Sequence, residues 1–206
     1  LAIREGGSPM DERIVESPDT KRKVRVPPGQ YATEDLPVLH LGYVPEVSQE
    51  AWKLRLWGLV EEERALSFDE LFSLPRIKVH SDIHCVTGWS KLDCLWEGVS
   101  ALVLTELVKI LPEARFALVH SADGYSTNLR LEDLFQEDVL LATHLDGKPL
   151  PREYGGPVRL VVPRLYFWKS AKWVTGVEFI EEETLGYWES RGYHPHGDPW
   201  KEERYG

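Results

Sequence analysis

Short segments in which apolar and polar residues alternate are the feature that most constrains the fold of this chain. Three such segments lie at residues 51–60, 77–84 and 115–121, and residues 173–180 are expected to form the last strand. Alternation with a period of two predicts strands that bury one face. A continuous apolar run at 158–162 predicts a strand buried on both faces, and the Asp-Gly turn at 146–147 predicts a hairpin. The sequence therefore predicts an α+β fold with mixed, largely antiparallel sheets and short helices.

Helical signals are few and short. Ser67 followed by Glu70 is a capping box, which predicts a helix that stops at Pro75. Apolar residues at helical spacing predict a second helix over residues 100–109 and one helical turn over 131–135.

The first 35 residues are polar, charged and interrupted by prolines, which predicts an extended N-terminal arm over the surface. Residues 36–206 contain neither an internal repeat nor a linker, so we expect them to form a single domain. Aromatic residues, Pro and Gly are frequent over residues 186–206, and this tail is expected to wrap irregularly over the core.

Charge and composition limit the function classes. A formal net charge of −10 disfavours a nucleic-acid partner, which requires a basic surface. The longest apolar runs fall far short of the ~20 residues that span a bilayer, so no membrane span is expected. Two cysteines, Cys85 and Cys94, do not make a disulfide framework. The simplest interpretation is a reduced, cytoplasmic protein.

Residues 84–89 (HCVTGW) place Cys85 at the end of a predicted strand, before a Gly-containing turn that can aim the thiol into a cleft. A buried cysteine that packs as a small apolar side chain is the ordinary alternative. A zinc site is disfavoured, because Cys85 and Cys94 lack the usual ligand spacing. A Cys–His hydrolase stays open. Its candidate bases are His40, His80, His84, His120 and His144.

A second constellation covers residues 154–177, which contain four cations and no Asp or Glu. The cations are Arg159, Arg164, Lys169 and Lys172. In an acidic chain this stretch indicates a bound anion, and Ser170 adds a hydroxyl suited to a phosphate. A basic surface patch paired with acids elsewhere is the alternative. The glycine-rich fingerprints of nucleotide-binding loops are missing from the sequence.

Read together, these segments resemble the molybdopterin domain of the sulfite oxidase family, collinearly from residue 36 onward. The matching segments are residues 52–58 (WKLRLWG), 85–90 (CVTGWS), 96–98 (WEG), 123–125 (DGY), 146–151 (DGKPLP), 155–163 (GGPVRLVVP) and 169–173 (KSAKW). The resemblance implies the sulfite-oxidase-type molybdopterin-binding fold and a molybdenum–molybdopterin cofactor without an appended nucleotide.

The resemblance also assigns roles to individual residues. Cys85 would be the metal ligand and the catalytic residue. The residues that would hold the cofactor are His40, His84, Ser121, Tyr154, Arg159, Ser170, Ala171 and Lys172. Within this set Arg159 and residues 170–172 would bind the pterin phosphate, and His84 would border the metal.

The predicted function is oxygen-atom transfer on a small sulfur-containing or similar substrate, by sulfite oxidation or sulfoxide reduction. The absence of arginine between Arg76 and Arg115 favours a neutral substrate or a reductase. Residues 1–206 carry neither a haem segment nor a dimerisation domain, which fits the stand-alone bacterial members of the family. We therefore expect a monomer supplied by an external electron carrier, a haem protein or another. A non-catalytic carrier of the cofactor is the alternative, and it has no need of Cys85.

Overall fold

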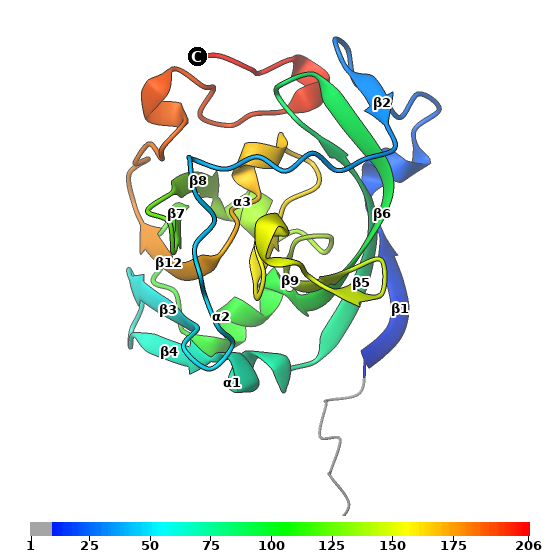
Figure 1. Cartoon of the computed structure of the whole chain (residues 1–206). Coiled ribbons are helices and arrows are strands. Elements are labelled where there is room, and N and C mark those ends of the chain that lie inside the picture. Colours follow the sequence, from blue (N-terminus) through cyan, green and yellow to red (C-terminus); the bar gives the residue numbers. More distant parts are fainter. Residues whose placement is uncertain (1–9) are drawn as a thin grey trace, which may run out of the picture.

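Two β-sheets form the body of the molecule (Figure 1). The computed structural model describes residues 10–206. The first sheet contains β1 (Met10–Glu16), β2 (Tyr31–Thr33), β5 (Arg76–His84), β6 (Trp89–Ser100), β9 (Leu140–Leu145), β10 (Lys148–Pro149) and β11 (Arg159–Val161). The second contains β3 (Lys53–Gly58), β4 (Arg64–Ser67), β7 (Phe116–Ser121), β8 (Ser126–Arg130) and β12 (Val174–Ile180).

The helices are short, as predicted. The α-helices are α1 (Phe68–Phe72), α2 (Leu104–Leu107) and α3 (Leu131–Leu134). The 3-10 helices are η1 (Pro18–Lys21), η2 (Ala101–Val103), η3 (Arg152–Tyr154), η4 (Phe167–Lys169), η5 (Glu189–Arg191) and η6 (Pro199–Lys201). No helix of the described chain is long and apolar enough to cross a membrane.

Strand order and direction confirm the predicted fold class. The first sheet runs β1-β5-β6-β9-β10, with β2 beside β6 and β11 beside β9, and the second runs β4-β3-β12-β7-β8. β1 with β5, β2 with β6, and β3 with β12 are parallel, whereas the other described pairings are antiparallel. The sheets are therefore mixed and largely antiparallel.

The apolar pattern of each strand sends its side chains to a defined core. Leu54 and Leu56 of β3 point into a large core to which both sheets contribute. β9 is buried on both faces, with Leu141 in the large core and Leu140 in a second core behind the first sheet. β11 alternates in the same way, and its Arg159 lies on the side of the strand opposite to Leu160.

One long strand was missed, and one helix prediction was wrong. β6, a twelve-residue strand, was missed because its apolar alternation is interrupted by Lys91 and by Asp93, whose backbone is left-handed (φ 58°). The helix predicted over residues 100–109 is only η2 followed by one turn of α2, and Val108 has already returned to extended backbone. The capping box of Ser67 and Glu70 is present as predicted.

The N-terminal arm is tied to the sheet more firmly than its polar sequence indicates. β1 lies along β5, and β2 lies along the start of β6. Arg25 binds the fully buried carboxylate of Asp82 through two hydrogen bonds of 2.9 and 2.6 Å. Polar residues of the arm therefore satisfy buried groups of the core.

Gly98 of β6 provides a test of the packing between β6 and β9. A Cβ there would overlap the main chain of Leu141 and Ala142, which cannot move aside. Gly98→Ala should therefore lower the free energy of unfolding by roughly 3 kcal/mol, measured by urea denaturation. Gly147→Ala is the control, because Gly147 faces open space and should cost only about 1 kcal/mol for its left-handed backbone. Equal losses in the two variants would contradict this packing.

Candidate functional site

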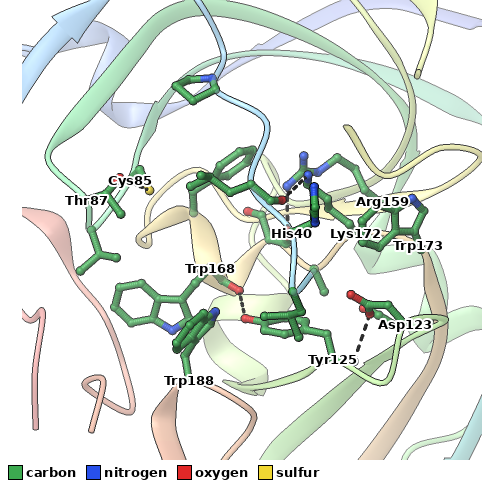
Figure 2. A pocket seen from close by; sticks show the side chains of 18 of the residues that line it. His40, Cys85, Thr87, Asp123, Tyr125, Arg159, Trp168, Lys172, Trp173 and Trp188 are labelled. Carbon is green, nitrogen blue, oxygen red and sulfur yellow. Dashed lines mark hydrogen bonds between the residues drawn. The ribbon is translucent and has the colours of Figure 1, made fainter. Parts of the chain in front are cut away.

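A pocket with about 820 Å³ of empty space, including its open mouth, lies where segments distant in sequence converge. Its lining residues fall within residues 37–41, 85–89, 121–125, 159–173 and 188–193. Cys85 and Thr87 lie at one side of the pocket, whereas Arg159 and Lys172 lie at the other (Figure 2). The chain between β2 and β3, which carries His40, crosses in front of the molecule (Figure 1). Residues 36–42 of this crossing are called the strap below.

Cys85 follows β5 and is held in a tight turn. Its N–H donates to the carbonyl of Trp89 at 2.8 Å, and the Gly88 N–H donates to the Cys85 carbonyl at 2.9 Å. The side chain is only 5% exposed, and its Sγ accepts a hydrogen bond of 3.1 Å from the Thr87 hydroxyl. Burial raises the pKa of the Cys85 thiol, while the Thr87 hydrogen bonds and the charge of Arg204 act in the opposite direction.

His84 is not among the residues that line the pocket, and its predicted place beside the metal stays a prediction. It is fully buried, with Nδ1 at 2.9 Å from the Ser90 hydroxyl and Nε2 at 3.5 Å from a carboxylate oxygen of Asp19. Adjacent residues of a strand point to opposite faces, so the chain that turns Cys85 toward the pocket turns His84 away from it. His84 therefore supports the turn from behind.

Arg159 is a buried cation on the pocket wall. Its guanidinium donates to the carbonyls of Tyr154 (2.9 Å) and Ser170 (2.7 Å) and lies 4.2 Å from the ring centre of Phe167. The residue is 1% exposed, and burial lowers its pKa to about 9. No carboxylate among residues 10–206 forms an ion pair with it. A buried charge is costly unless it is paired, so Arg159 is suited to an anionic ligand.

Lys172 reaches the same part of the pocket. Its Nζ donates to the carbonyls of Leu39 in the strap and Glu153, both at 2.6 Å. Burial and the nearby charge of Arg159 lower the pKa of Lys172 to about 7. The two cations therefore repel each other until an anion binds between them.

The other two cations of the basic stretch have acidic partners. Lys169 is fully buried and lies 2.7 Å from a carboxylate oxygen of Glu189, and Arg164 lies 2.9 Å from a carboxylate oxygen of Asp138. Two of the four cations in residues 154–177 are therefore paired with acids, as the alternative interpretation of this stretch has it. Arg159 and Lys172 remain as the pocket's cations.

Several further predicted residues line the pocket. Ser121, at the end of β7, has a buried hydroxyl with no hydrogen-bond partner in the described structure, which a ligand could satisfy. Ser170 and Ala171, which directly precede Lys172 in the chain, also line the pocket, and the Ser170 hydroxyl accepts a 2.9 Å hydrogen bond from the Val162 N–H. His40 lines the pocket from the strap, where its Nδ1 accepts from the Gly42 N–H.

Tyr154 is outside the described pocket lining, and its predicted cofactor contact stays a prediction. Its hydroxyl donates to the Leu36 carbonyl of the strap at 3.0 Å, and its own carbonyl accepts from Arg159. The side chain is occupied by the strap because the η3 helix turns it toward that segment rather than toward the cavity. Tyr154 therefore supports Arg159 and the strap.

An aromatic wall was not predicted residue by residue. Trp188 stacks on Tyr193 with ring centres 5.0 Å apart, and Trp168 meets the same tyrosine edge-on at 5.0 Å. All three line the pocket. The aromatic-rich tail was the signal for this wall, but its position depends on how the tail folds back. Glu189, which pairs with Lys169, fixes Trp168 by accepting a 3.0 Å hydrogen bond from its indole N–H.

The alternative chemistries find little support at Cys85. The hydrogen-bond partner of its sulfur is Thr87, not a histidine base as a Cys–His hydrolase requires. Within residues 10–206, no three His, Cys, Asp or Glu side chains lie close enough together to hold a metal ion. The polar groups that do converge, a thiol at one side and a hydroxyl and two cations elsewhere, fit a cofactor with its own metal-binding sulfurs and a phosphate.

Comparison with known proteins agrees with this donor set. The family described as oxidoreductase molybdopterin binding domain matches residues 40–188. An uncharacterized oxidoreductase, YuiH of Bacillus subtilis, is 46% identical and is aligned over 88% of this chain and 92% of its own length. The catalytic subunit of a protein-methionine-sulfoxide reductase, MsrP of Campylobacter jejuni, is 30% identical over 68% of this chain. The chain spans only 52% of that relative.

A solved structure shows the same fold. The sulfane dehydrogenase SoxCD of Paracoccus pantotrophus superposes with a TM-score of 0.62, at 23% identity, over 68% of this chain and 40% of that one. The matched family segment contains Cys85, Arg159 and Lys172. The chain therefore belongs to the molybdopterin-dependent oxidoreductases of the sulfite oxidase family, and molybdenum–molybdopterin is its cofactor.

Proposed function

We propose that this protein reduces a neutral sulfoxide to a thioether by oxygen-atom transfer. The observation that carries the proposal is the composition of the pocket, which combines a buried thiol, a pair of cations on the far side and an aromatic wall. The relatives named methionine-sulfoxide reductases support the substrate class. Sulfite oxidation is the second candidate, because the family contains both activities.

The charges in the pocket favour the neutral substrate. Arg159 and Lys172 are the only Lys or Arg residues among its described lining residues, and both lie away from Cys85 (Figure 2). An anion such as sulfite would need cations beside the reacting atom. Trp168, Trp188 and Tyr193 instead offer apolar faces, which suit an uncharged sulfoxide and its alkyl groups.

One group of residues would hold the cofactor, and another would direct its metal. Arg159, Lys172 and the Ser121 hydroxyl would bind the phosphate and polar groups of the pterin. The Cys85 thiolate would be the metal ligand, and Thr87 would donate a hydrogen bond to its sulfur. When bound, the cofactor supplies the two-electron oxygen-atom transfer. A sulfoxide then yields a thioether and water, and consumes two electrons and two protons.

The electrons would come from an external carrier, because this chain has two cysteines and lacks a C-x-x-C-H haem motif. The cytoplasmic location and the monomeric state stay predictions. A carrier of the cofactor without activity is the remaining alternative, and it is separated from an enzyme by the role of Cys85.

Cys85→Ser tests the role of the thiol. The variant should keep most of its pterin, which Arg159 and Lys172 hold, and should lose sulfoxide reduction by at least about a hundredfold, because serine is a harder ligand that stays protonated. Activity with a reduced dye and the Mo(V) electron paramagnetic resonance spectrum are the measurements.

Cys94→Ser is the matched control for this experiment. Cys94 is 1% exposed and packs in the second core, and burial raises its pKa to about 12. Its substitution should cost stability and leave the spectrum unchanged. Wild-type activity and spectrum in Cys85→Ser would exclude the thiol as metal ligand and favour the carrier function.

The pKa of Lys172 predicts a pH dependence of cofactor retention. Above its pKa of about 7 the free lysine is neutral and must take up a proton before it can pair with a phosphate. The affinity for the cofactor should therefore fall by up to about tenfold per pH unit between pH 7 and 8.5. Lys172→Arg, which stays charged, should abolish the dependence. Molybdenum content after dialysis at each pH is the measurement, and equal slopes for both proteins would show that Lys172 does not bind the phosphate.

A further inference from the structure

The turn that carries Cys85 accepts hydrogen bonds from segments near both ends of the described chain. From the arm, the Gln30 side chain donates to the Cys85 carbonyl at 3.0 Å, and the Tyr31 N–H donates to the Gly88 carbonyl at 2.8 Å. From the tail, the Arg204 guanidinium donates to the Val86 carbonyl at 2.6 Å. The C-terminal tail and β2 lie at the same end of the molecule as the β5–β6 connection (Figure 1).

Arg204 joins the three segments. One nitrogen of its guanidinium binds the Val86 carbonyl, and the other lies 3.3 Å from the carbonyls of both Pro28 and Gly29. Its guanidinium also lies over the ring of Tyr166, 5.3 Å from the ring centre. A planar fork of fixed geometry can bridge two main-chain segments in this way, whereas a lysine ammonium cannot hold both in one orientation.

Arg204 also brings a positive charge to this turn, because its guanidinium lies 2.6 Å from the carbonyl of Val86, the residue after Cys85, without lining the pocket. No arginine lies between Arg76 and Arg115 in the sequence. The arginine charge beside this turn therefore comes from a distant residue that the fold brings near it. Arg204 also lies outside residues 40–188, which match the family.

We propose that Arg204 is a positioning residue for Cys85: it fixes the turn that directs the sulfur into the pocket and places a positive charge beside that turn. The inference rests on the proposed role of Cys85 as the metal ligand. The two effects have separate consequences. The fork restrains the main chain of residues 85–89, and the charge stabilises the more negative, reduced state of a metal bound to that sulfur.

Arg204→Gln and Arg204→Lys separate the two effects, because the first removes the charge and the second keeps it without the fork. Arg191→Ala is the control. Arg191 lies on the same tail, donates to a main-chain carbonyl, that of Tyr187, at 2.7 Å, and lies 3.6 Å from the centre of that tyrosine ring, but it does not line the pocket. It therefore reports the cost of losing a tail arginine whose contacts stay within the tail.

The first readout is hydrogen exchange of the peptide covering residues 85–89 in cofactor-free protein, which needs no bound metal. Both Arg204 variants should exchange about tenfold faster than wild type there, with β12 unchanged as the internal reference. Arg191→Ala should exchange as wild type does at residues 85–89. Wild-type protection of this peptide in both Arg204 variants would overturn the proposal.

The second readout is the Mo(V) spectrum and the midpoint potential of the loaded protein. Arg204→Gln should shift the potential to more negative values and lower kcat about tenfold with an unchanged KM, whereas Arg204→Lys should keep the potential near wild type. Faster exchange with an unchanged potential and spectrum in Arg204→Gln would show that Arg204 only restrains the turn. That result would overturn its role toward the metal. A wild-type protein without any Mo(V) signal would instead refute the proposed function, and the exchange measurement would still decide whether Arg204 positions Cys85.

Discussion

The site depends on a guanidinium that is buried without a carboxylate. Arg159 is placed by β11, which is the strand that the continuous apolar run predicts, and its neighbours in that strand are buried in the two cores. Main-chain carbonyls of Tyr154 and Ser170 hold its nitrogens, and Phe167 covers its face. Removing a cation from water costs several kcal/mol, which main-chain dipoles offset only in part. The wall of the pocket is therefore preorganised for an anion. A second cation, Lys172, adds positive charge on the same side of the pocket.

The side of the pocket that holds Cys85 follows a different principle. A soft sulfur is brought to the cavity by a five-residue turn, and that turn is stabilised by side chains from the arm, the tail and the buried group of His84 and Ser90. Polar contacts of this kind orient a ligand and leave its sulfur free to bind. The anion-binding side and the sulfur side thus have separate supports, so the protein can hold the cofactor and direct its metal through different residues.

Part of this arrangement can be predicted from the sequence, because it is encoded locally. Alternation predicted β3, β5 and β7. The motif around Cys85 and the basic stretch at 154–177 predicted residues on the two sides of the pocket. His84 could have been separated from Cys85 by the same alternation, since neighbours in a strand face opposite ways. Lys169 and Arg164 could not be separated from Arg159, because their acidic partners are distant in sequence. Arg204 and the aromatic wall reach the site only through the path of the tail, which follows no periodic pattern.

The central claim is that this chain binds one molybdenum through one pterin, with the phosphate on the Arg159 side and the metal on the Cys85 side. The most direct measurement is the metal content of the purified protein by elemental analysis, together with chromatography of the fluorescent pterin released by acid. The account predicts about one molybdenum and one pterin per chain, without guanine or cytosine nucleotide. Stoichiometric zinc in place of molybdenum, or protein that contains neither molybdenum nor pterin after expression in a host that makes the cofactor, would contradict it.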